Sequence, residues 1–300
     1  MPAAQLDPPT CSTSADFQFV VAGGWHSALA GVLASIVFVA IVFVLTNDPQ
    51  AEEHRHERGP SLRILFVTFF FFLVASFLWS TVAGFSETIP DRGTGRDVAS
   101  AVQPVLAVPA AWLLSIGAVL LFFAVSWLVS AYEGHRSLSS NVLTTATRCF
   151  RLIAWLSAVE VWIAIETASR SLAGRGWWYS PTAVGIVTLV AVPFLFADRV
   201  PWPARPGSRS HDGPDGSLGR ALRFVGVSAT VLVVLFGAIT GQPDVAVLHE
   251  GNWCGEGLSW WAALMALGAM GLFLASIAVL SRNLPGSTVS RTNVRSAGAS

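Results

Sequence analysis

Lysine is absent from this chain, and charged residues of either sign are scarce. All 18 basic residues are arginine, and charged residues make up 12% of the 300 residues, against about 25% in a soluble domain. Without lysine there is no Schiff base to a substrate or to retinal, and no lysine for a phosphate-binding P-loop. The 18 acidic residues balance the arginines, so net charge does not indicate nucleic-acid binding.

Motifs for catalysis and for cofactor binding are also missing. The sequence contains no GxSxG, HExxH or GxGD pattern, which hydrolases and intramembrane proteases would need. None of the six histidines falls at the middle of an apolar run, so haem held between helices is not expected. We therefore expect a protein that is not an enzyme and that carries no cofactor.

Long apolar runs dominate what is present, since 53% of the residues are hydrophobic. A bilayer core of about 30 Å requires roughly 20 apolar residues per spanning helix. Seven runs approach or exceed that length, at residues 24–45, 64–85, 104–131, 152–169, 182–197, 222–241 and 258–281. The sequence predicts an all-α fold class: a polytopic integral membrane protein with a bundle of seven transmembrane helices.

The distribution of arginine predicts the orientation, because basic residues in short loops stay on the cytoplasmic side. With seven spans and the N-terminus outside, 14 of the 18 arginines fall inside the cell, and omitting the span at 152–169 removes this bias. The C-terminus is then inside. We expect residues 1–23 to form an extracytoplasmic tail, 24–281 the seven-helix domain and 282–300 a disordered cytoplasmic tail.

Tryptophan collects near the predicted outer ends of the spans. Aromatic side chains with a polar edge concentrate at membrane interfaces, which makes interfacial anchoring the preferred interpretation. The residues concerned are Trp25, Trp79, Trp112, Trp177, Trp178, Trp253, Trp260 and Trp261.

Glu160 is the residue that most invites a functional interpretation. It lies nine residues after Arg151 and ten before Arg170, near the middle of a predicted span, where an ionised side chain is costly. No arginine lies inside any span, so we expect Glu160 to lack a cationic partner and to be a neutral, hydrogen-bonded acid. It shares a helix face with Ile153, Ser157, Ala164 and Thr167.

Three interpretations of Glu160 follow. It ties helices together as a structural hydrogen-bonding group, it serves in a proton or ion relay, or it faces lipid. The small and hydroxyl-bearing residues on its face favour the structural interpretation. The cost of placing an ionisable group in the middle of a membrane favours the relay, since such groups are usually functional.

The loop between the last two predicted spans carries several potential metal ligands. His249, Glu250, Cys254 and Glu256 could bind zinc or copper, with His26 on the same side of the membrane. Their spacing matches no structural zinc pattern. Loop residues without a bound metal are therefore the preferred alternative.

The cysteines suggest a disulfide. Cys11 and Cys254 are both predicted to be extracytoplasmic, where the environment is oxidising, whereas Cys149 lies at the cytoplasmic side. A Cys11–Cys254 disulfide would fix the N-terminal tail across the mouth of the bundle. Two free thiols are the alternative.

Two functions remain open. The leading hypothesis is a non-enzymatic membrane scaffold, sensor or partner subunit, and the alternative is a small proton-linked transporter or channel that uses Glu160. The lipid bilayer and other membrane proteins are the expected partners, with no nucleic acid among them. Arginine in place of lysine, with abundant Ala, Gly, Val and Pro, is typical of a GC-rich genome, so we expect the bacterial cytoplasmic membrane.

Overall fold

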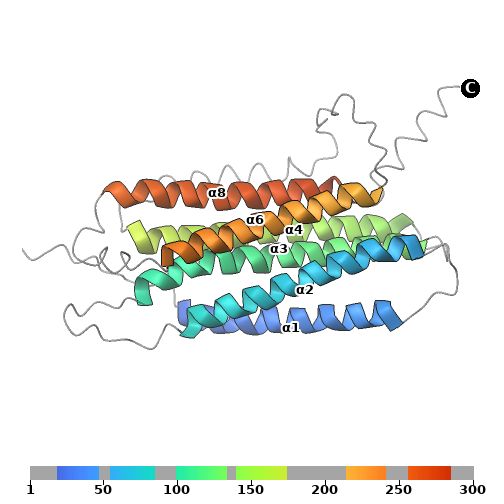
Figure 1. Ribbon diagram of the computed structural model, residues 1–300, viewed down its shortest axis with the longest axis horizontal. Helices are drawn as coiled ribbons and strands as arrows, with labels where there is room; N and C mark the ends of the chain where they lie inside the picture. The colour runs from blue at the N-terminus through green and yellow to red at the C-terminus, as the bar shows by residue number, and fades with distance from the viewer. Residues whose placement is uncertain are drawn as a thin grey trace, which may run out of the picture.

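The computed structural model describes residues 19–46, 55–84, 99–133, 140–173, 214–240 and 256–284. These residues are helical up to Ser281, which confirms the all-α prediction for the described part of the chain (Figure 1). The predicted span at 182–197 lies outside the described residues. The helices are α1 (Phe19–Thr46), α2 (Arg55–Gly84), α3 (Ala99–Glu133), α4 (Ser140–Ala173), α6 (Pro214–Thr240) and α8 (Glu256–Ser281).

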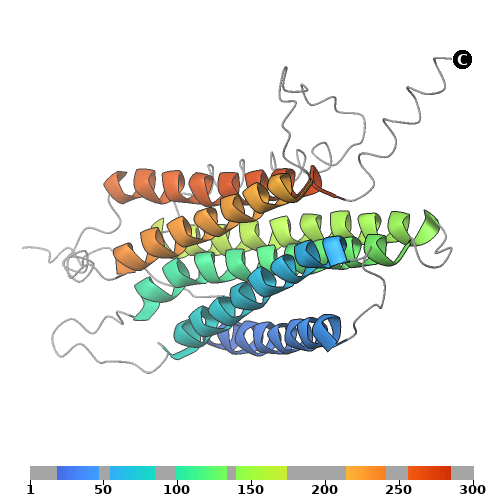
Figure 2. The same ribbon diagram turned by 45° about the vertical axis from the view of Figure 1, so that its right-hand side comes forward.

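The six described helices form an elongated bundle with their axes along its long dimension (Figures 1 and 2). Helices that follow one another through short connections run in opposite directions. Four helices are long and apolar enough to cross a membrane, over Val21–Thr46, Gly59–Gly84, Val105–Val129 and Gly216–Phe236. The α4 helix, which carries four charged residues between 148 and 166, is not one of these four.

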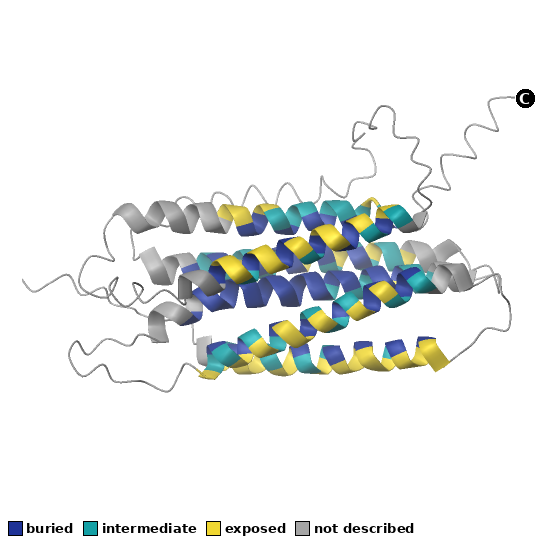
Figure 3. Cartoon of the chain, in the orientation of Figure 1, coloured by how far each residue is buried: buried dark blue, intermediate teal, exposed yellow. Residues whose placement is uncertain are grey.

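The α3 helix occupies the centre of the bundle and is almost wholly buried (Figure 3). It packs against α1, α2, α4, α6 and α8, so large apolar side chains such as Leu120 and Phe123 have no exposed surface. Gly117 permits a close approach of α2. A Cβ atom there would lie 2.8 Å from the ring of Phe72, which is itself fully buried.

The α1 helix lies at the edge of the bundle and packs chiefly on α2. At Gly23 a Cβ atom would lie 3.0 Å from the Trp79 carbonyl oxygen and 3.1 Å from the Ala83 nitrogen. Hydroxyl groups continue this contact, since Ser76 Oγ donates to the Ser27 carbonyl oxygen at 3.1 Å. Small and hydroxyl residues are those that let membrane helices approach closely.

The opposite face of α1 is apolar and exposed. It presents large side chains along the whole helix, as lipid contact would require (Figure 3). The exposed residues include Trp25, Leu29, Val32, Ile36, Val39 and Phe43.

The predicted interfacial role of two tryptophans is wrong. Trp79 is 3% exposed, and Trp112 is fully buried with its ring edge-to-face against Phe273 of α8, at a centroid distance of 6.0 Å. Trp25, at 75% exposure, has the accessibility that interfacial anchoring requires. Position near the end of a span does not determine how a helix is rotated, and rotation decides whether a tryptophan meets lipid or core.

Candidate functional site

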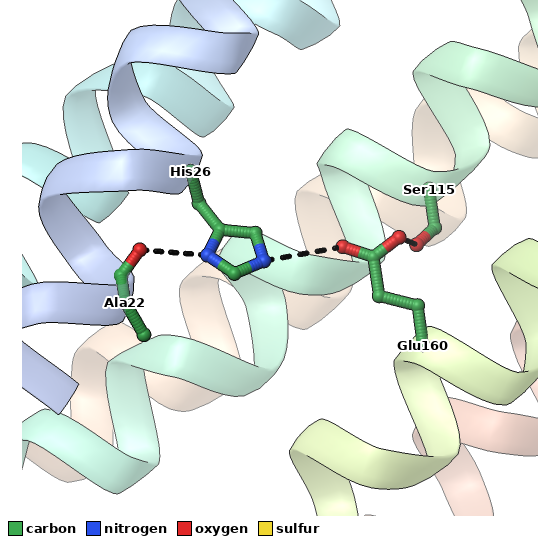
Figure 4. Close-up of polar contacts among 4 residues, drawn as sticks. All are labelled: Ala22, His26, Ser115 and Glu160. Carbon is green, nitrogen blue, oxygen red and sulfur yellow. Dashed lines mark hydrogen bonds and ion pairs between the residues drawn. The ribbon is translucent and has the colours of Figure 1, made fainter. Parts of the chain in front are cut away.

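Three helices contribute polar side chains that meet inside the bundle (Figure 4). Ser115 of α3 donates a hydrogen bond from Oγ to Oε2 of Glu160 on α4, at 2.8 Å. His26 of α1 places Nε2 3.9 Å from Oε1 of the same carboxyl group. We refer to His26, Ser115 and Glu160 as the polar cluster.

The helix around Glu160 explains how its side chain reaches the other helices. Ala154, Ala158 and Val161 of α4 are buried, as is Ser157, and Glu160 lies at the edge of this stripe. Small residues on the stripe allow α3 and α4 to pack closely. The longer Glu160 side chain then extends beside α3, where it meets Ser115 and His26. Of the residues that share the predicted face of Glu160, Ser157 is buried, whereas Ile153, Ala164 and Thr167 are partly exposed.

His26 is held in place by two further contacts. Its Nδ1 donates to the carbonyl oxygen of Ala22, one turn earlier in α1, at 2.7 Å. Its ring stacks on that of Trp79 from α2, with centroids 4.5 Å apart and planes at 23°. The close packing at Gly23 brings α1 near enough to α2 for this stacking. His26 therefore faces Glu160 in a defined orientation.

The two titratable members of the polar cluster are accessible. The side chains of His26 and Glu160 are 33% and 37% exposed, whereas Ser115 is buried. The Ser115 hydroxyl fixes the carboxyl group from within.

The sequence indicates Glu160 as a site residue and His26 as a possible metal ligand, but it does not indicate that the two lie together. The expectation of a hydrogen bond to a serine or threonine agrees with the Ser115 contact. The expectation that Glu160 lacks a cationic partner considered arginine alone, whereas the structure places His26, which is charged only when protonated, 3.9 Å from the carboxyl group. One signal was available, since His26 is the sole titratable side chain in the sequence of α1.

The other predicted site residues are not brought together in the described part of the chain. Cys11, His249, Glu250 and Cys254 lie outside the described residues, and Glu256 is described only as the first residue of α8. Among the described residues, no group of three or more His, Cys, Asp or Glu side chains gathers to hold a metal. The disulfide and the metal site remain predictions.

Comparison with known proteins adds no family to this picture. No protein-family model matches the chain, and neither a curated protein nor a solved structure is significantly similar to it.

Proposed function

We propose that the chain is an integral membrane protein with seven spans, its N-terminus outside the cell and its C-terminus inside. The start of α1 and the end of α8 lie at opposite ends of the bundle, which supports an odd number of crossings (Figures 1 and 2). The end of α4 and the start of α6 also lie at opposite ends. This arrangement of the two helix ends supports a crossing by the apolar run at 182–197, which lies between them in the sequence.

The positions of arginine in the helices support the proposed orientation. Eight arginines lie near the end of the bundle where α2, α4 and α6 begin and α8 ends, and Arg170 lies near the other. The positive-inside rule then assigns the arginine-rich end to the cytoplasm. The eight residues are Arg55, Arg58, Arg63, Arg148, Arg151, Arg220, Arg223 and Arg282.

Reporter fusions test this topology. Fusions after residues 50, 140, 210 and 290 are expected to report the cytoplasm, and fusions after 95, 175 and 250 the exterior. Alkaline phosphatase and a fluorescent protein, which are active on opposite sides, make the two sets complementary. An exterior result at 210 would exclude the seven-span arrangement.

We propose further that the protein is a non-enzymatic membrane sensor or partner subunit whose polar cluster responds to protons. The observation that carries this proposal is the 3.9 Å contact between His26 and Glu160, which links the peripheral α1 helix to α4. Histidine changes charge within the physiological pH range, and a change of charge inside a membrane has a large electrostatic effect. A proton bound here therefore acts on the position of α1.

The direction of the response follows from the charges of the pair. An imidazolium attracts a carboxylate, and this attraction needs one group protonated and the other ionised. Acid removes the attraction by protonating both groups, and base removes it by deprotonating both. We therefore expect α1 to approach α4 at intermediate pH and to move away at either extreme.

Spin-label distances test the sensor proposal. The chain is prepared with its three cysteines replaced by serine and with labels at Leu29 and Ile163, which are exposed positions on α1 and α4. Double electron–electron resonance in lipid nanodiscs, between about pH 4 and 9, is expected to show that the distance between the two labels depends on pH. His26→Gln and Glu160→Gln should abolish the dependence.

The control for this experiment is His56→Gln, a change at the start of α2 at the far end of the bundle. It should leave the pH dependence of the α1–α4 distance unchanged. A distance that stays constant with pH in the parent protein, or a dependence that survives Glu160→Gln, would refute the sensor proposal.

A second candidate function is a proton-linked transporter or channel, favoured by the presence of two titratable side chains, His26 and Glu160, that face each other and are both partly exposed. In liposomes with an internal pH dye, such a protein would dissipate a proton gradient, and Glu160→Gln would abolish the flux. A sensor gives a pH-dependent α1–α4 distance without flux. The two assays together therefore separate the candidates.

A further inference from the structure

The contacts of His26 determine which of its ring nitrogens carries hydrogen. A backbone carbonyl oxygen accepts hydrogen bonds and cannot donate them, so the 2.7 Å contact with Ala22 requires a hydrogen on Nδ1. In the neutral ring, Nε2 is then an unprotonated acceptor. This acceptor is the nitrogen that faces Oε1 of Glu160 at 3.9 Å (Figure 4).

The carboxyl group is fixed in a complementary way. Ser115 donates to Oε2, so Oε1 is the oxygen turned toward His26. Without an added proton, Nε2 and Oε1 are two acceptors that face each other, an arrangement without attraction. One proton between them converts this arrangement into a donor and an acceptor.

We propose that His26 and Glu160 form a binding site for a single proton, shared between Nε2 and Oε1. The Ala22 carbonyl and the Ser115 hydroxyl are its positioning groups, because they direct one nitrogen and one oxygen toward each other. The proposal deepens the proposed function, on which it rests for the membrane setting of the cluster, and it specifies the proton stoichiometry of the site.

The proton has two positions that leave the net charge of the pair at zero. In one, Glu160 is a neutral acid with hydrogen on Oε1, and His26 is a neutral imidazole. In the other, the O–H bond has broken and an N–H bond has formed at Nε2, which gives a carboxylate and an imidazolium. Neither position leaves a net charge in the membrane, whereas loss or gain of a proton does.

A single water molecule can carry the proton across the 3.9 Å separation. That distance exceeds a direct hydrogen bond, but two hydrogen bonds of about 2.8 Å from one water bridge it at an angle of about 90°. The water accepts the Glu160 proton and donates one of its own hydrogens to Nε2. Atoms and charge balance in this transfer.

On α1, α2 and α3, no titratable residue other than His26 occupies a position close to the polar cluster. His26 is the only titratable residue in α1. The titratable residues of α2 and α3 lie toward the other end of the bundle. They are Arg55, His56, Glu57, Arg58 and Arg63 on α2, and Tyr132 and Glu133 on α3. On α4, Glu166 is six residues beyond Glu160 on a different face, and Arg148, Cys149, Arg151 and Arg170 are farther along the helix.

The two remaining helices carry their titratable residues at their ends. On α6 these are Asp215, Arg220 and Arg223, and on α8 Glu256 at the start, with Arg282 directly after its end. Among the described helices, His26 and Glu160 are therefore the two titratable groups that the proposed proton would join.

Infrared and nitrogen NMR spectra of the full chain in nanodiscs test the shared proton. Difference infrared spectra should contain a carboxylic acid C=O band that is lost in Glu160→Gln. Its disappearance on raising pH should coincide with a change in the His26 ring signals, at one common midpoint. In His26→Gln, the proton concentration at which half of the Glu160 band has disappeared should change by at least about tenfold.

Serine variants on α3 separate positioning from general stability. Ser115→Ala should shift the Glu160 band, whereas Ser126→Ala, which loses a hydroxyl bonded to the Phe122 carbonyl of the same helix, should not. An unprotonated Nδ1 in the nitrogen spectrum, or an unchanged Glu160 midpoint in His26→Gln, would overturn the proposal. A constant α1–α4 distance with these spectra intact would refute the sensor function alone.

Discussion

Gly23→Val is expected to separate α1 from α2 and to remove His26 from the polar cluster. A Cβ atom at position 23 would already lie within 3.0–3.3 Å of Trp79 and Ala83, and two of the three nearest atoms belong to the α2 backbone. A side chain can relieve a clash by changing its rotamer, but backbone atoms in a helix cannot, so the helices must move apart. Overpacking of this kind costs about 1–3 kcal/mol.

The neighbouring glycine provides a matched control. Gly24 is exposed, and a Cβ atom there would meet nothing within 4 Å, so Gly24→Val should leave the packing intact. Thermal unfolding in detergent, followed by tryptophan fluorescence, should show a lower midpoint for Gly23→Val alone. Equal stability of the two variants would contradict the close contact between α1 and α2.

Glu160→Leu is expected to destabilise the protein far more than Glu160→Gln. Leucine leaves the buried Ser115 hydroxyl and the Nε2 atom of His26 without the group that both now face. Loss of a partner from a buried polar group costs about 1–3 kcal/mol. Glutamine keeps an oxygen to accept from Ser115, and its amide can donate to Nε2, so it should preserve folding while removing titration.

Unfolding midpoints and yields of folded protein from the membrane distinguish these outcomes. We expect a yield close to that of the parent protein for Glu160→Gln and a reduced yield for Glu160→Leu. If both variants are equally stable, the carboxyl group makes no hydrogen bond that matters for the fold, and the cluster does not exist as described. If both fail to fold, an ionised carboxylate is itself required for stability.

Much of this architecture could be predicted from the sequence because it depends on local composition. Apolar length identifies helices that can cross a membrane, and it found α1, α2, α3 and α6 in nearly the positions observed. Boundaries were less accurate. Helix α4 begins at Ser140 and not near residue 152, since polar residues continue a helix beyond its apolar run.

The polar cluster could be predicted only in part, because it depends on which helix faces are brought together. Glu160 was conspicuous as a carboxylate within a predicted span, whereas His26 lies near the end of its helix and far away in sequence. Its pairing with Glu160 depends on the rotation of α1, which Gly23 and Ser27 set against α2. Hydropathy records none of these relations. Because hydropathy does not give the rotation of a helix, the sequence also predicted Trp79 and Trp112 at the membrane surface, whereas both are buried.

The position of α1 has a consequence for how the chain is assembled in the membrane. Helices α1 and α2 interlock through small residues and hydroxyl groups, so in the proposed membrane setting they can associate as a hairpin once both are inserted. The His26–Glu160 contact cannot form until α4 has been inserted, more than a hundred residues later in synthesis. Until then His26 has only its contacts with Ala22 and Trp79, and its contact with Glu160 joins the α1–α2 pair to α4 before α6 and α8 are added.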